Sequence, residues 1–159
     1  RDKGRNLLML GDDMWAYIPD LKRAIRVSLS QKLTGEAANG DIARARWSGD
    51  YDPKLVQENE KSWTLELTAT RRGLTYERAR IVVEKQTFRP LSAEYLTLEG
   101  AVLKRAEFRA YRSIAGATRP TEIAIRDAVR QDRTSLIVIR SMEAKTFKDS
   151  EFLQSNLGP

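Results

Sequence analysis

The sequence predicts a mainly β protein, in which antiparallel strands joined by short turns form one up-and-down sheet that curls to bury its apolar face. Apolar and polar residues alternate with a period of two over several segments, which places alternate side chains on opposite faces of a strand. Turn-forming residues separate these segments regularly. With 159 residues, of which 41% are hydrophobic and 31% charged, the chain suits one globular domain.

The first predicted strands form a meander over residues 6–28. Two extended apolar runs flank the turn-forming trio Gly11-Asp12-Asp13, and Pro19-Asp20 ends the second run. A third run begins at Arg23, and its apolar and polar residues alternate up to Leu29. Short turns between extended runs are typical of antiparallel hairpins.

The clearest later strand runs from Trp63 to Ala69, where every second residue is apolar. Further strands are predicted at Ala79–Val83, Leu91–Thr97, Val102–Tyr111, Arg119–Arg126 and Ser135–Ser141. The turns that separate them are predicted at Arg71-Arg72-Gly73, Phe88-Arg89-Pro90, Leu98-Glu99-Gly100, Ile114-Ala115-Gly116 and Gln131-Asp132-Arg133. A single curved layer needs a cover, for which we expect two short helices, at Asp52–Asn59 and Ser150–Ser155.

Composition excludes several kinds of chemistry. The chain has no histidine and no cysteine, which removes Ser-His-Asp and Cys-His catalysis, thiolate chemistry and the usual zinc sites. We therefore expect a protein that is not an enzyme, with no catalytic residue, no metal site and no cofactor. The longest apolar runs, Leu7–Leu10 and Leu136–Ile139, are far shorter than the roughly 20 residues of a spanning helix.

The net charge of +6 does not identify a partner, because a basic surface attracts nucleic acids, anionic lipids and acidic proteins alike. The basic residues are spread through the predicted strands instead of being concentrated in a tail. This distribution is typical of solvated strand faces.

The opening hairpin also carries a family pattern: an apolar strand, a Gly/Asp turn, a Trp-x-Tyr-x-Pro stretch and a basic strand. The chain reads Gly11-Asp12-Asp13-Met14-Trp15-Ala16-Tyr17-Ile18-Pro19 and then Lys22-Arg23-Ala24-Ile25-Arg26-Val27. It resembles the LolA/LolB-like superfamily of periplasmic outer-membrane lipoprotein-sorting proteins. Residues 31–43, together with Gly49-Asp50-Tyr51, look like the loop that follows in this superfamily, and the likeness extends more loosely to Leu157.

The resemblance implies an incomplete, strongly curved antiparallel half-barrel with helices lodged against its mouth. The family normally places a helix and further strands before the hairpin, so we expect a single domain over residues 1–159 that lacks these elements. A sheet edge exposed in this way favours dimerisation. The resemblance further implies a periplasmic carrier or chaperone for lipidated proteins or free lipid, which acts between an inner-membrane transporter and an outer-membrane acceptor.

Strand parity and the resemblance together indicate which residues face an apolar cavity: Trp15, Tyr17, Ile25, Val27, Trp63, Leu65, Leu67, Ile81, Val83, Phe108, Ile123 and Ile125. Core packing predicts the same alternation, so both interpretations stay open for each residue. Around Trp15 the opposite parity, with Met14, Ala16 and Ile18 inward, is also open. Arg44, Arg46 and Trp47 lie in the loop that the resemblance places near the cavity mouth, where cations and an amphipathic aromatic ring suit a lipid head group.

Two other functions remain open. The same half-barrel would also serve a regulatory sensor that binds a protein or lipoprotein partner. Arginines interleaved with aromatic residues over Arg105–Arg112 would suit RNA. Because no RNA-recognition consensus accompanies them, we expect no nucleic acid partner.

Overall fold

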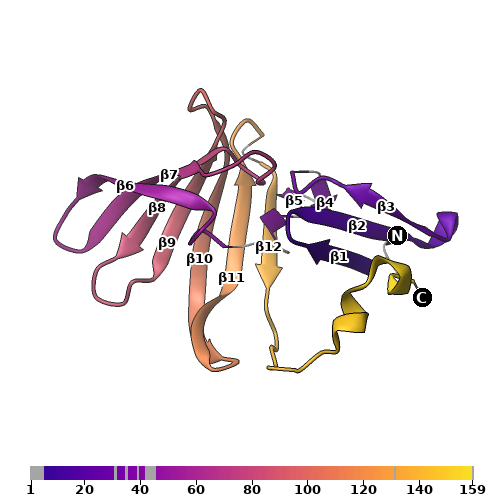
Figure 1. Ribbon diagram of the computed structural model, residues 1–159. Helices are drawn as coiled ribbons and strands as arrows, with labels where there is room; N and C mark the ends of the chain where they lie inside the picture. Colours follow the sequence, from indigo (N-terminus) through magenta and orange to yellow (C-terminus); the bar gives the residue numbers. More distant parts are fainter. Residues whose placement is uncertain are drawn as a thin grey trace.

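The structure is a computed structural model that describes residues 6–30, 32–34, 36–38, 40–41, 46–130 and 132–158. Two antiparallel sheets dominate it and lie side by side in Figure 1. We call the seven-stranded sheet the large sheet and the three-stranded sheet the small sheet. The mainly β fold class is therefore confirmed. The large sheet is curved and does not close into a barrel, because its two edge strands do not pair with each other.

The small sheet is the meander predicted at the start of the chain. It consists of β1 (Asn6–Leu10), β2 (Asp13–Ile18) and β3 (Arg23–Val27), in that order. Gly11 makes the first turn possible because its φ of +59° lies in the left-handed region. The second turn is a short 3-10 helix, η1 (Pro19–Leu21). Met14 and Ala16 of β2 are the most buried residues of this sheet. The face on which Met14, Ala16 and Ile18 point inward, the second of the two open parities, is therefore its better packed face.

The large sheet has simple up-and-down topology, since neighbouring strands in space are also neighbours in sequence. Its strands are β6 (Tyr51–Glu58), β7 (Ser62–Ala69), β8 (Arg78–Glu84), β9 (Pro90–Leu96), β10 (Val102–Ile114), β11 (Ala117–Asp127) and β12 (Thr134–Val138). The strands predicted from Trp63 onward are all present. The strands β6 and β12 form the two edges of this sheet. Dimerisation through an exposed edge stays a prediction.

The helix predicted over Asp52–Asn59 is wrong, because this segment is the edge strand β6. Pro53 and Leu55 stand opposite Leu67 and Leu65 of β7. A proline is tolerated at a sheet edge, where its missing N–H faces away from the ladder. Pairing with β7 therefore overrides the helix signal that Pro53 appeared to give.

The prediction of a terminal helix is confirmed in part. Two 3-10 helices, η2 (Asp149–Phe152) and η3 (Gln154–Asn156), lie in this segment. They do not cover the large sheet, because η2 contacts β1 and Asn6 donates a 2.6 Å hydrogen bond to the Gly158 carbonyl. Figure 1 shows the chain leaving β12 and ending beside the small sheet. Within the described part of the chain, no helix has the length and apolar character to cross a membrane.

One face of the large sheet, which we call the inner face, carries the apolar core. Its buried residues come from five adjacent strands: Leu67, Ala79, Ile81, Ala93, Ala106 and Ile125. Ala37 completes this cluster from β5 (Ala37–Ala38), which pairs with β4 (Lys32–Thr34). The chain between the two sheets therefore supplies the cover that the sequence analysis assigned to helices.

The opposite, outer face carries a row of charged residues. Glu66, Arg80, Glu94 and Arg105 stand in register across four strands and form consecutive ion pairs. These exposed pairs contribute little stability individually. They agree with the prediction that most arginines lie on solvated strand faces.

Arg71, in the turn after β7, joins the two sheets. Its guanidinium donates to both carboxylate oxygens of Asp12, at 2.7 and 2.9 Å, and to Asp50 at 2.9 Å. Asp12 belongs to the turn of the small sheet, whereas Asp50 directly precedes β6. The contacts of the two carboxylates raise the pKa of Arg71 above its usual range.

Candidate functional site

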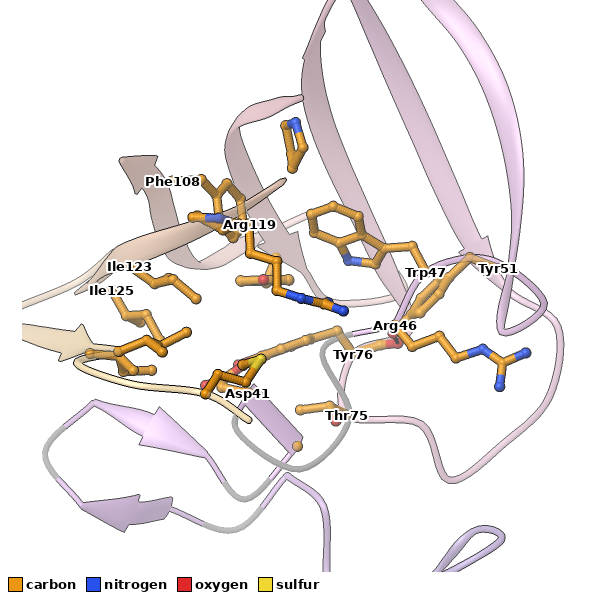
Figure 2. A pocket seen from close by; sticks show the side chains of 17 residues that line it. Asp41, Arg46, Trp47, Tyr51, Thr75, Tyr76, Phe108, Arg119, Ile123 and Ile125 are labelled. Atoms are coloured by element: carbon orange, nitrogen blue, oxygen red, sulfur yellow. Dashed lines mark hydrogen bonds between the residues drawn. The ribbon is translucent and has the colours of Figure 1, made fainter. Parts of the chain in front are cut away.

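The inner face contains a cavity of about 400 Å³, within the size range of small-molecule sites. It lies between β9–β12 and the chain segments around Trp47 and Tyr76. Figure 2 shows the side chains that line it. Its lining residues are Gly40, Asp41, Arg46, Trp47, Tyr51, Thr75, Tyr76, Pro90, Tyr95, Phe108, Arg119, Pro120, Ile123, Ile125, Ile137, Ile139 and Met142.

The wall on the large sheet is apolar and is fixed by strand register. Phe108 of β10 stands opposite Ile123 of β11, which in turn stands opposite Ile137 of β12. Trp47 closes this wall from the connecting chain, because its ring meets the Phe108 ring edge-on at a centroid distance of 5.6 Å. Such a surface suits an apolar ligand and lacks a reactive group of its own.

A buried polar cluster forms the floor. The Lys104 ammonium lies 3.3 Å from the Asp41 carboxylate, and the Tyr76 hydroxyl donates to the same carboxylate at 2.8 Å. The Asp41 side chain is only 4% exposed and that of Lys104 10%. The Ala38 amide donates a third hydrogen bond to Asp41, at 2.7 Å. A charge pair in such a buried place is tolerated because its members are mutually paired and further hydrogen-bonded.

Two tyrosines complete the floor. The rings of Tyr76 and Tyr95 stack at 4.2 Å, and the Lys104 ammonium lies 5.6 Å from the Tyr76 ring centroid. Burial, followed by the charge of Asp41, raises the pKa of both phenols well above the ordinary value. Both hydroxyls therefore remain neutral throughout the physiological range. The Tyr51 hydroxyl donates to the Tyr76 carbonyl at 2.9 Å and fixes the backbone of this segment.

Gly40 brings the connecting chain close to the turn between β7 and β8. A Cβ atom at this position would lie 1.7 Å from the Thr75 hydroxyl oxygen, so a larger residue does not fit without movement. The Gly40 amide donates to the Leu29 carbonyl at 2.9 Å. This close approach holds Asp41, the next residue, in its place in the floor.

Arginines stand at the cavity rim. In Figure 2 the Arg119 side chain extends over the cavity in the direction of Trp47, whereas Arg46 extends away from it. The Arg46 guanidinium donates to the Ser48 carbonyl at 2.9 Å. The cavity thus combines apolar walls with a cationic rim.

Five of the predicted site residues meet at this cavity: Arg46, Trp47, Phe108, Ile123 and Ile125. Leu67 and Ile81 belong to the packed core, and Leu65 and Val83 pack against it. Trp63 lies on the same face but farther away, where its ring stacks on Phe88 at 5.7 Å. Arg44 lies outside the described residues.

The predicted residues of the small sheet do not line the cavity. Register places Ile25 opposite Ala16 and Val27 opposite Met14. Trp15 and Tyr17 have the other parity, so these two and the two residues of β3 do not share a face. This corrects the expectation that all four line one concave surface. The physical reason is the strict alternation of β2, whose buried Met14 and Ala16 occupy the better packed side.

Four residues that line the cavity were not predicted from the sequence: Asp41, Tyr76, Tyr95 and Arg119. Lys104, which pairs with Asp41 in the polar cluster, was not predicted either. Parity was an available signal for two of them. Lys104 alternates with Ala106 and Phe108, and Arg119 alternates with Thr121 and Ile123, so both are cations on an otherwise core-facing row. A charge in such a row indicates a buried partner or a ligand. No comparable signal marks Asp41.

The comparisons with known proteins agree in fold. A family model described only as an uncharacterized protein matches residues 1–158. No curated protein matches the chain. A crystal structure of a LolA superfamily protein from Nitrosomonas europaea is 37% identical, with a TM-score of 0.85 over 94% of this chain and 70% of that chain.

Two more distant structures share the fold. One is described as an outer membrane lipoprotein-sorting protein domain from Vibrio parahaemolyticus, with 21% identity and a TM-score of 0.71, covering 91% of this chain and 65% of that one. The other is a DUF1329 family protein from Desulfovibrio piger, with 23% identity and a TM-score of 0.68, covering 91% and 64%. The chain therefore spans 70%, 65% and 64% of the lengths of these three proteins.

Proposed function

The chain belongs to the LolA superfamily, and from this premise we propose that it is a carrier that shields acyl chains of a lipid or lipidated protein in the cavity on its inner face. The observation that carries the proposal is the apolar wall of Phe108, Ile123 and Ile137, which leaves a cavity of about 400 Å³ beside a packed core. Each methylene transferred from water contributes roughly 0.8 kcal/mol, so a few carbons give useful affinity.

The proposed process consists of binding and release without bond chemistry. Asp41 and Lys104 are the charged groups of the floor, and each is held by the other. The Tyr76 hydroxyl donates a hydrogen bond to Asp41 and has a raised pKa, which makes it a poor proton donor to a substrate. These contacts support a structural role for the floor. They favour a carrier over an enzyme.

The proposed setting is the periplasm. Lipidated proteins or free lipid would be the cargo, received from an inner-membrane transporter and passed to an outer-membrane acceptor. The support is membership of a superfamily whose solved structures include a domain described as an outer membrane lipoprotein-sorting protein. Native mass spectrometry of protein purified from a Gram-negative host would reveal co-purified acyl species.

A direct test uses two neighbouring residues of β12. Ile137 lines the cavity, whereas Leu136 is 56% exposed and faces the outer side. We expect a monoacylglycerol with a brominated acyl chain to quench tryptophan fluorescence saturably. Ile137→Gln should weaken binding by roughly tenfold, because it places an amide on the apolar wall.

Leu136→Gln is the matched control and should leave the affinity unchanged. Absence of saturable quenching in the unmodified protein would contradict the carrier function. Equal effects of the two substitutions would place binding elsewhere than in the cavity. Thermal unfolding of both variants establishes that each remains folded.

A further inference from the structure

The arginine at the cavity rim has a directly opposed partner of the same charge. Arg119 of β11 stands opposite Arg112 of β10. Arg119 has the parity of Ile123 and lines the cavity. Arg112 is not itself a lining residue, but its Nε reaches the hydroxyl of Thr121, which has the same parity as Arg119, so both arginines lie on the inner face. Like charges directly opposite on neighbouring strands destabilise a sheet.

A second opposed pair, Arg105 and Arg126, shows how the sheet normally accommodates this repulsion. This pair lies on the outer face, where Arg105 donates to Glu94 at 3.0 Å and Arg126 approaches Thr134 at 3.4 Å. In the outer pair, therefore, one of the two charges, that of Arg105, is compensated by a carboxylate.

The inner pair has no such compensation. Among the ion pairs of the described residues, neither Arg112 nor Arg119 takes part in one. Arg112 is instead held in place by a neutral group, since its Nε donates at 3.2 Å to the hydroxyl of Thr121. Thr121 is fully buried and donates in turn to the Ala110 carbonyl at 2.6 Å. A fixed guanidinium without a carboxylate remains available to an external anion.

The charge balance of the cavity points the same way. Asp41 is the acidic residue among the lining residues, and Lys104 already neutralises it. Arg46 and Arg119 add positive charge at the rim, beside apolar walls. An amphiphile whose head is anionic satisfies both features at once.

We propose that Arg112 and Arg119 bind the anionic head group, a phosphate or carboxylate, of an amphiphile whose apolar part lies in the cavity. This inference rests on the proposed carrier function and specifies the cargo. Guanidinium groups suit both anions because their N–H groups form paired, charge-assisted hydrogen bonds. Ile125 in the core lies six positions after Arg119 at the rim, roughly 20 Å along an extended strand. The head would stay near water while the tail points toward the floor.

Two probes that differ only in the head group test this inference. Lysophosphatidic acid and the monoacylglycerol with the same acyl chain are titrated calorimetrically into the full chain. We expect the phosphate to strengthen binding by at least about tenfold, the contribution of a few charge-assisted hydrogen bonds. The double variant R112Q/R119Q should lose this preference but still bind the monoacylglycerol, whereas R112K/R119K should keep part of it.

The outer pair provides the matched control, since R105Q/R126Q removes the same charge from the other face and should keep the preference. If neither probe binds, the carrier function fails together with this inference. If both probes bind equally to the unmodified protein, the carrier function stands and the head-group site is refuted. Persistence of the preference in R112Q/R119Q also refutes it. Inorganic phosphate that binds as tightly as lysophosphatidic acid would show a free-anion site and overturn the amphiphile.

Discussion

Asp41 and Lys104 are 63 residues apart in the sequence, yet their side chains form an ion pair of 3.3 Å beneath the cavity. The pair attaches the chain between the two sheets to β10. Hydrogen bonds from Tyr76 and the Ala38 amide hold the same carboxylate. The floor of the cavity therefore belongs to the packing that holds the cover on the inner face.

Removal of one member of this ion pair should lower the stability of the protein. Lys104→Met leaves the Asp41 carboxylate buried with two neutral donors, and we expect a loss of about 3 kcal/mol in the free energy of unfolding. Urea unfolding followed by circular dichroism measures it. The double variant D41N/K104M should recover part of the loss, because neither position then carries an unpaired charge. Additive losses in the double variant would refute the coupling.

Stability should fall at alkaline pH because of the floor tyrosines. Tyr76 and Tyr95 have raised pKa values in the folded protein, while the unfolded chain ionises its tyrosines near pH 10. The folded state thus binds more protons than the unfolded state above about pH 10, and its stability decreases as pH rises. Below that pH this contribution is fully present.

Tyr76→Phe separates the two effects of this hydroxyl. At pH 8 the variant should be less stable by about 1 kcal/mol, since the hydrogen bond to Asp41 is lost. Between pH 10 and 11.5 its urea midpoint should fall less steeply than that of the unmodified protein. Equal slopes would show that Tyr76 ionises as easily in the folded as in the unfolded state.

The strands were predictable because each pairs a period-two pattern with a turn. Gly11, for example, stands between two apolar runs and adopts the left-handed conformation that a tight turn requires. The strand β6 was missed because Pro53 near its start also suits the first turn of a helix. Only its pairing with β7 distinguishes the two, and that contact is tertiary.

The candidate site was predictable only where residues share a strand pattern. Phe108 and Ile123 emerge from parity, and a stricter use of parity would have added Lys104 and Arg119 as cations on an apolar row. Asp41 has no local signal, because its role depends on Lys104, which is 63 residues away. The cover of the inner face was predicted in the wrong segments for the same reason. A short connecting segment around Ala37 packs on the sheet without any helical periodicity.

Because Gly40 lies so close to Thr75, a larger residue at position 40 should lower the stability of the protein. Gly40→Ala places a methyl group 1.7 Å from the Thr75 hydroxyl oxygen, so the connecting chain must move away from the floor. We expect destabilisation by about 1–3 kcal/mol, as for other overpacked sites. Thr75→Ala in the same chain removes the hydroxyl and should restore part of the stability. Calorimetric unfolding of the single and double variants measures the coupling.

Trp47 should contribute to cargo affinity because it closes the apolar wall. Its ring meets Phe108 edge-on, so Trp47→Ala removes both a contact surface for an acyl chain and the aromatic pair. We expect the affinity for a monoacylglycerol to fall by about tenfold, which corresponds to roughly 1.4 kcal/mol. Trp63→Ala removes an equal ring that stacks on Phe88 outside the cavity, and it should leave the affinity unchanged. Calorimetric titration of both variants compares them, and unchanged affinity in Trp47→Ala would exclude this residue from the binding surface.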